Sequence, residues 1–285
     1  LTFVTDSSDI DVVPTIQNGN HLNHTIGLGA MGLHSYFAKN HMEYGSPESI
    51  EFTDLYFMLL NYWTLVESNN IAKERGTTFH NFENSDYADG SYFASYIADA
   101  PQPKSDKVQS LFEGVFIPSA EDWQALSDEV QKYGLYHQNR LAVAPTGSIS
   151  YINDTSASIH PITRLIEERQ EKKIGKIYYP AAHLDNDTIG YYTSAYDTDM
   201  RRVIDIYAAA QKHVDQGMSL TLFLRSEIPE GLYEWKTDTN KQTTRDLNIL
   251  RNYAFHKGIK SIYYVRTFTE DEEEIGSNQC ESCVI

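Results

Sequence analysis

Apolar residues recur at helical spacing along several stretches of the chain. Between Leu22 and Asn40 they return every three or four residues, which predicts a helix. A second helix is expected to begin at Ser46-Pro47-Glu48, because serine caps helix N-termini and proline favours the first helical position. It should end near Arg75, just before Gly76. Further helices are predicted near residues 91–99, 105–113, 121–133, 198–216 and 243–258.

Short runs of aliphatic, β-branched and aromatic residues predict buried strands. They lie at residues 141–144, 177–179, 220–224 and 261–265. In the second half of the chain these strands alternate with predicted helices, which favours parallel βα units and an α/β fold. Residues 1–19 are mixed in character and are expected to form a strand or loop.

Composition limits the classes of function. The chain has 285 residues and a formal net charge of −17, which disfavours nucleic-acid binding because phosphate contacts require lysine and arginine. No run approaches the ~18 apolar residues of a membrane helix, and the opening residues do not resemble a secretory signal. With only two cysteines, these features favour a reducing, cytoplasmic setting without membrane association.

Both cysteines, Cys280 and Cys283, lie at the end of the chain. Such a pair can form a disulfide and be reduced again at little cost in chain entropy, so the sequence predicts a flexible redox-active tail over residues 267–285. Two cysteines can instead supply half of a zinc site completed by another chain, or belong to an inert tail. A thioredoxin-like fold is disfavoured, because its Cys-x-x-Cys opens a helix and here only two residues follow.

A loop of small polar residues follows the predicted strand at 141–144. It consists of Thr146, Gly147, Ser148, Ile149 and Ser150. Glycine permits a positive φ, and successive amides in such a turn can bind a phosphate. Ligands also gather at the carboxyl ends of parallel strands. The alternative is an ordinary turn capped by hydroxyl groups.

Two further patterns each allow two interpretations. Gly27, Gly29 and Gly32 fit the dinucleotide-binding pattern G-x-G-x-x-G, but polar residues precede them where that motif needs a buried strand, and close helix packing is the alternative. Tyr263 and Tyr264 are typical of core packing, although a tyrosine pair can also relay an oxidising equivalent. Because neighbouring strand residues point to opposite faces, stacked phenols require the strand to bend or end there.

Taken together, these segments resemble the large catalytic subunit of class I ribonucleotide reductases, and most closely class Ib. The resemblance runs from about Asn20 to Ile285. The matching segments are residues 26–29, 144–153, 158–161, 215–223 and 257–264 and the terminal Cys-x-x-Cys. It implies a C-terminal half of a ten-stranded α/β barrel over residues 1–266, with leading helices, followed by the flexible tail. In that frame Gly27, Gly29 and Gly32 are helix-packing residues.

The resemblance also implies roles. Thr146 to Ser150 correspond to the loop that holds the diphosphate of a ribonucleoside diphosphate. Tyr263 and Tyr264 correspond to the pair that passes a radical from the small subunit, whose dimetal or dimetal-tyrosyl cofactor generates it. Cys280 and Cys283 correspond to the dithiol that re-reduces the active site and is itself reduced by a thioredoxin or glutaredoxin-like protein. No metal or cofactor is expected on this chain itself.

The chain departs from the family in its cysteines. The family uses a thiyl-radical cysteine in an Asn-x-Cys-x-Glu loop and two further active-site cysteines, none of which occurs in this sequence. We therefore expect the chain to be inactive alone and to act with an N-terminal complementing portion of the subunit. The rival interpretations are a non-catalytic regulatory or assembly subunit that retains the fold, and an independent thiol-redox protein.

Overall fold

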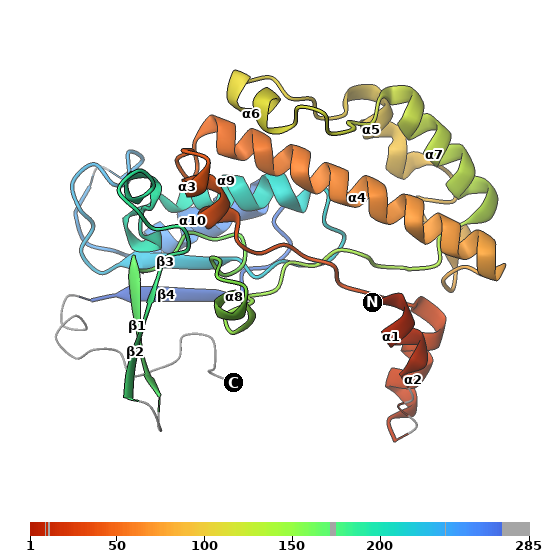
Figure 1. Cartoon of the computed structure of the whole chain (residues 1–285), viewed down its shortest axis with the longest axis horizontal. Helices are drawn as coiled ribbons and strands as arrows, with labels where there is room; N and C mark the ends of the chain where they lie inside the picture. The colour runs from red at the N-terminus through yellow and green to blue at the C-terminus, as the bar shows by residue number, and fades with distance from the viewer. Residues whose placement is uncertain (9, 11, 172–174, 237, 270–285) are drawn as a thin grey trace. The chain divides into compact units, whose positions relative to one another are not determined.

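The computed structural model describes residues 1–8, 10, 12–171, 175–236 and 238–269 (Figure 1). The chain divides into two compact units. The first consists of Leu1–Leu28, Glu51–Ala142 and Lys212–Gln216, and the second of Gly29–Ile50, Val143–Gln211 and the residues from Gly217 onward. No helix in the described part of the chain combines the length and apolar character that crossing a membrane requires.

The first unit is helical. Its elements are α1 (Thr2–Ser7), α2 (Pro14–Asn23), α4 (Pro47–Arg75) apart from its first turn, the 3-10 turns η1 (Phe82–Asn84) and η2 (Ser91–Phe93), α5 (Ala94–Asp99), α6 (Asp106–Leu111) and α7 (Ala120–Tyr133). Trp123 of α7 is fully buried, stacks on Tyr96 at a ring-centroid distance of 4.2 Å and meets Tyr62 edge-on at 4.9 Å. Aromatic packing therefore joins α4, α5 and α7 into one core.

The long helix α4 follows its sequence signals. The hydroxyl of Ser46 accepts a hydrogen bond from the amide of Ser49 at 3.2 Å, Pro47 is the first helical residue, and Gly76 adopts a φ of +65° directly after the last. The predicted start and end are both confirmed. Helices α5, α6 and α7 also lie where helices were predicted, and α7 begins with a capping box between Ser119 and Asp122.

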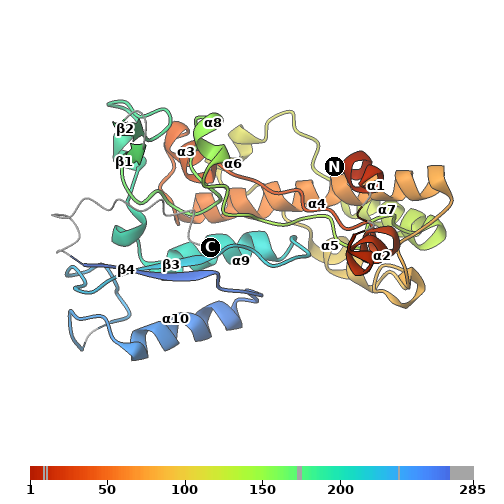
Figure 2. The ribbon, with the colours of Figure 1, turned by 90° about the horizontal axis from the view of Figure 1, so that it is seen from below.

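The second unit mixes helices and strands. Its elements are α3 (Leu33–Lys39), α8 (Ile149–Ile152), β1 (Ile166–Glu171), β2 (Gly175–Pro180), the 3-10 turns η3 (Ile189–Tyr191) and η4 (Ala195–Asp197), α9 (Met200–Gln211), β3 (Thr221–Arg225), α10 (Thr244–His256) and β4 (Tyr264–Phe268). This content fits the predicted α/β class. Strands β3 and β4 pair in parallel with Thr221 opposite Tyr264, and α10 connects them, which confirms a parallel βα unit. Helix α9 contacts both β3 and α10 (Figure 2).

Two predictions near the N-terminus are wrong. Residues 1–19 contribute to helices α1 and α2, and Pro14 occupies the first position of α2. The helix expected from Leu22 to Asn40 is interrupted, because α2 ends at His24 in the left-handed region and α3 begins only after Gly32 at φ +84°. Gly27, Gly29 and Gly32 all lie in the non-helical segment between them, so none of the three packs from within a helix, and Gly32 is the residue that precedes α3.

Two strand predictions need correction. Residues 141–144 form only isolated parallel bridges, Leu28 with Leu141 and Val143 with Met218, because each partner segment runs alongside for a single residue pair. The strand at 177–179 exists within β2, but it pairs antiparallel with β1 in a hairpin. The strands of the described residues thus form two two-stranded sheets and no closed barrel.

Candidate functional site

The second unit contains a cavity of about 210 Å³. Its wall is drawn from the loop and short helix after Val143, residues 154–167, the hairpin strand β2 and the strands β3 and β4. Of the residues predicted to act together, Gly147, Ser150, Tyr263 and Tyr264 all line it, whereas Thr146, Ser148 and Ile149 are not part of its wall. Residues more than 110 positions apart in the sequence therefore meet at one cavity.

The loop before α8 holds its shape through its own hydroxyls. Thr146 has a φ of +50°, and its hydroxyl accepts a hydrogen bond from the amide of Ser158 at 2.7 Å. The hydroxyl of Ser150 donates to the carbonyl of Gly147 at 3.1 Å. These two hydroxyls stabilise the turn, as the ordinary-turn interpretation requires.

The first backbone amides of the same loop do not form hydrogen bonds that stabilise the turn. The N–H groups of Gly147, Ser148 and Ile149 donate no hydrogen bond to any of the described residues, while the next amide, that of Ser150, donates to the carbonyl of Thr146 at 3.1 Å. Three successive free amides in a turn make a site of positive potential that suits a phosphate group. The loop therefore has both properties that its sequence allowed: a hydroxyl-braced turn and a row of available donors.

The backbone at Gly32 packs closely against Thr155 and Ser156, which follow the loop in the chain. The amide of Gly32 donates to the carbonyl of Ser156 at 2.8 Å, and the hydroxyls of Ser35 and Thr155 lie 2.8 Å apart. A Cβ on Gly32 would lie 2.1 Å from the Thr155 hydroxyl oxygen, so only glycine fits at this positive φ. The glycine that the dinucleotide pattern singled out thus has a packing role at the start of α3.

The tyrosine pair lies where β4 begins. Tyr263 precedes the strand and Tyr264 is its first residue, so the phenols are not constrained to opposite faces. Their ring centroids are 4.0 Å apart at an interplanar angle of 51°. Both are partly exposed, at 49% and 37%. The hydrogen bond with Tyr264 raises the pKa of Tyr263. Core packing, the alternative for this pair, does not describe side chains that are this exposed.

Sequence reasoning assigned no role to four further side chains in the cavity wall, Arg266, Tyr151, Glu167 and His160. The guanidinium of Arg266 lies 5.6 Å from the ring centroid of Tyr264. The phenol of Tyr151 donates to the carboxylate of Glu167, which ties α8 to β1. His160 lies in the wall beside Phe223 of β3, with ring centroids 5.5 Å apart. Tyr151 and His160 belong to segments that carry the family resemblance, residues 144–153 and 158–161, but neither motif indicated what their side chains contact.

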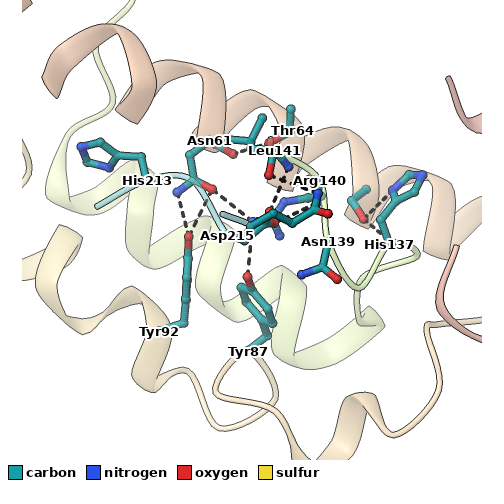
Figure 3. Close-up of polar contacts among 12 residues, drawn as sticks. Asn61, Thr64, Tyr87, Tyr92, His137, Asn139, Arg140, Leu141, His213 and Asp215 are labelled. Atoms are coloured by element: carbon teal, nitrogen blue, oxygen red, sulfur yellow. Dashed lines mark hydrogen bonds and ion pairs between the residues drawn. The ribbon is translucent and has the colours of Figure 1, made fainter. Parts of the chain in front are cut away.

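A second cluster of polar side chains lies in the first unit, around the fully buried Arg140. Figure 3 shows Asn61, Tyr92 and Arg140 pointing toward one another. The Nη2 atom of fully buried Arg140 lies 3.1 Å from Asn61 Oδ1 and 3.3 Å from a carboxylate oxygen of Asp215. The carboxylate of Asp215 also accepts the amide of Arg140 at 2.8 Å. Burial by itself lowers the pKa of Arg140, but the neighbouring tyrosines and Asp215 outweigh it, and the pKa is raised.

The same network continues through a histidine. Asn61 donates to the phenols of Tyr92 and Tyr96 at 2.9 and 3.2 Å. The phenol of Tyr96 lies 2.8 Å from Nδ1 of His213, whose Nε2 lies 2.9 Å from the carboxylate of Asp54. Burial lowers the pKa of His213, although Asp54 opposes this effect. The Nη2 atom of Arg140 is bonded within this network, whereas its Nε and Nη1 atoms are buried without a hydrogen-bond partner among the described residues. The side chains of the network otherwise bond mainly to one another, which is typical of a structural core.

The remaining predicted site residues, Cys280 and Cys283, lie outside the described residues. In the part of the chain that is described, no three His, Cys, Asp or Glu side chains are arranged to hold a metal ion.

Known proteins match this chain along its length. The family model for the ribonucleotide reductase barrel domain matches residues 1–265. The ribonucleoside-diphosphate reductase subunit alpha of Bacillus subtilis is 43% identical over 285 residues, which is 100% of this chain and 38% of the relative. The subunits alpha of Mycoplasma pneumoniae and Helicobacter pylori are 44% and 32% identical, over 100% and 96% of this chain and 39% and 33% of their own lengths. The chain thus spans about two fifths or less of these relatives, and it belongs to the ribonucleotide reductase barrel-domain family.

Proposed function

We propose that this chain is part of the large subunit of a class I ribonucleoside-diphosphate reductase, which converts ribonucleoside diphosphates to 2'-deoxyribonucleoside diphosphates by radical chemistry. The observation that carries the proposal is one cavity of the second unit that is lined both by Gly147 and Ser150 of the loop and by the pair Tyr263 and Tyr264. Names of relatives that cover the whole chain support the same reaction.

In this proposal the loop binds the diphosphate of the substrate. The free amides of Gly147, Ser148 and Ile149 supply directed donors, and the hydroxyls of Thr146 and Ser150 hold the turn in shape. Because these amides are fixed before the ligand arrives, binding requires little reorganisation of the loop.

Tyr263 and Tyr264 relay the radical in this proposal. Each phenol is oxidised by loss of one electron and one proton and recovers both from the next group in line. The ring-centroid distance of 4.0 Å supports direct transfer between the two. The first oxidising equivalent comes from a radical-generating small subunit with a dimetal or dimetal-tyrosyl cofactor.

In this proposal the tail dithiol, Cys280 and Cys283, re-reduces the active site after each turnover. Reduction removes the 2'-hydroxyl of the substrate as water and converts two active-site thiols into a disulfide. Cys280 and Cys283 exchange with that disulfide, become oxidised and are reduced in turn by a thioredoxin or glutaredoxin-like protein. An N-terminal complementing portion supplies the active-site cysteines and completes the ten-stranded barrel.

The relay is tested in the complete enzyme assembled with its small subunit. Tyr263→Phe and Tyr264→Phe should each abolish turnover, because phenylalanine has no O–H to lose, while both variants should fold because the side chains are partly exposed. Tyr178→Phe is the matched control, since Tyr178 is 59% exposed on β2 and is not part of the cavity wall. Turnover near the control level in either relay variant would refute this role.

The diphosphate loop is tested through its backbone. Ser148 has a φ of −87°, so Ser148→Pro removes one amide donor with little backbone change, and the preceding glycine tolerates the proline. We expect the KM for ribonucleoside diphosphates to rise at least about tenfold. Ser148→Ala keeps the amide and should leave the KM unchanged. Equal KM values for the two variants would exclude this amide as a phosphate ligand.

The tail is tested by separating single from multiple turnover. Cys280→Ser should still allow one round of reduction but stop continued turnover with a protein reductant, and a small dithiol that reaches the active site should restore it. Ser282→Ala, between the two cysteines, is the control. Multiple turnover of Cys280→Ser with the protein reductant would contradict the shuttle.

A further inference from the structure

His160 has a fixed tautomer. Its Nδ1 lies 2.8 Å from the carbonyl oxygen of Pro161. A carbonyl only accepts hydrogen bonds, so Nδ1 must carry the proton and donate it. In the neutral ring the other nitrogen, Nε2, is then unprotonated and is a hydrogen-bond acceptor.

The surroundings keep this ring neutral and hold it in place. Burial lowers the pKa of His160, the hydrogen bond to the Pro161 carbonyl opposes this effect, and the positive charge of Arg266 adds to the lowering. The ring packs against Phe223 of β3 at 5.5 Å between centroids. Nε2 has no hydrogen-bond partner among the described residues, and His160 is part of the cavity wall. The cavity wall therefore contains an acceptor that has no partner in the part of the chain that the structure describes.

This acceptor is a ring nitrogen that cannot donate, unlike the hydroxyl groups of the wall, and that is uncharged, unlike the two carboxylates of the wall, Asp154 and Glu167. The amide of Gly147 and the guanidiniums of Arg164 and Arg266 are hydrogen-bond donors in the wall, which suit an anion. The carboxylate of Glu167 already accepts the phenol of Tyr151. A neutral nitrogen lone pair repels phosphate oxygens, which are acceptors too, and attracts O–H or N–H groups. The wall thus contains hydrogen-bond donors that suit an anion, and it also contains a neutral acceptor that suits an O–H or N–H group.

We propose that Nε2 of His160 accepts a hydrogen bond from an O–H or N–H group on the nucleoside part of the ligand whose diphosphate binds the amides of residues 147–149. This inference rests on the proposed function, since it assigns the nucleoside end of the same ligand. His160 is then a substrate-binding residue that distinguishes a nucleoside diphosphate from a bare diphosphate.

The test compares two amide variants in the protein as it occurs in the cell. His160→Asn places its amide N–H where Nδ1 donates to Pro161 and removes the acceptor at Nε2. His160→Gln reaches the position of Nε2 and supplies an amide oxygen there. Binding of inorganic pyrophosphate and of each ribonucleoside diphosphate is measured by calorimetry, and thermal denaturation confirms that both variants fold.

We expect His160→Asn to weaken ribonucleoside diphosphate binding by about tenfold, to leave pyrophosphate binding unchanged, and His160→Gln to recover most of the loss. Ribonucleoside diphosphate binding of His160→Asn equal to wild type, or an equal loss for pyrophosphate, would overturn the inference. Failure of the wild-type protein to bind either ligand would instead refute the proposed function on which it rests.

Discussion

Polar side chains are arranged in opposite ways in the two units. In the first unit Asn61, Tyr92, Arg140 and Asp215 bond to one another around the fully buried Arg140 (Figure 3). In the second unit Gly147, Ser150 and His160 line a cavity, and the amides of residues 147–149 and the Nε2 of His160 have no partner within the described residues. Both arrangements contain arginine, tyrosine and histidine, so residue type alone does not separate them.

The two units differ in the partners of these polar groups, which bond mainly to other protein groups in the first unit and line a cavity in the second. A buried polar group without a partner is costly, so side chains that bond mainly to one another contribute to stability. Groups that face a cavity remain hydrated until a ligand replaces the water. The first unit is therefore expected to respond to mutation in its stability, and the second in its binding.

The largest expected effect is a difference in unfolding free energy between substitutions of two arginines, Arg140 and Arg164. Arg140→Met removes the cation beside Asp215, whose side chain is 11% exposed, and we expect a loss of about 3–5 kcal/mol in unfolding free energy. Arg164→Met, at an exposed position in the cavity wall, should change stability by less than about 0.5 kcal/mol but weaken pyrophosphate binding. Chemical denaturation and calorimetry measure both quantities. Equal stability losses would remove the distinction between the two sites.

A smaller effect is expected at two glycines. Gly32→Ala adds a Cβ that would lie 2.1 Å from the Thr155 hydroxyl oxygen at a positive φ, so it should destabilise the chain by about 2 kcal/mol and distort the loop support. Gly19→Ala, in helix α2 with no atom within 4 Å of the added Cβ, should stabilise by about 0.5–1 kcal/mol. Thermal melts of both variants test this. A neutral Gly32→Ala would mean that the close approach is not required.

The third prediction concerns the loss of folding stability at low pH. Nδ1 of His34 accepts the amide of Ile162 at 2.9 Å, and burial lowers the pKa of His34 from 6.5 to about 3. Between these values the unfolded chain binds a proton that the folded chain does not. Stability should therefore be full above pH 6.5 and fall as the pH falls toward 3, by about 1.4 kcal/mol per pH unit from this group.

Denaturation at several pH values measures this slope against His34→Asn, whose amide oxygen still accepts the Ile162 amide but does not titrate. The slope of the variant should be shallower across this window. Identical slopes would show that His34 binds its proton equally in the folded and unfolded chain.

Features that depend on short stretches of sequence were predicted well. Helix α4 was bounded by Ser46, Pro47 and Gly76, and the parallel pair β3 and β4 followed from a strand–helix–strand pattern. In both cases the residues that determine the structure lie next to the element itself.

Features that depend on distant partners were not predicted. The ion pair of Arg140 and Asp215 joins residues 75 positions apart, and neither position has a local signal. His160 was missed although its Nδ1 contacts only the next residue, Pro161, because the sequence does not show that its ring lines a cavity beside Phe223 of β3. The break between α2 and α3 was missed because the apolar spacing continued through Gly27 to Gly32, while the positive φ of Gly32 reflects packing on Thr155.

Hydrogen–deuterium exchange with and without a ribonucleoside diphosphate tests the contrast between the two units most directly. The account predicts slower exchange at residues 146–151 and 263–266, whose backbone lies in or beside the cavity wall, and no change at residues 54–61, 87–96, 139–141 and 213–215 of the network around Arg140. Protection of the network without protection of residues 146–151 would contradict it.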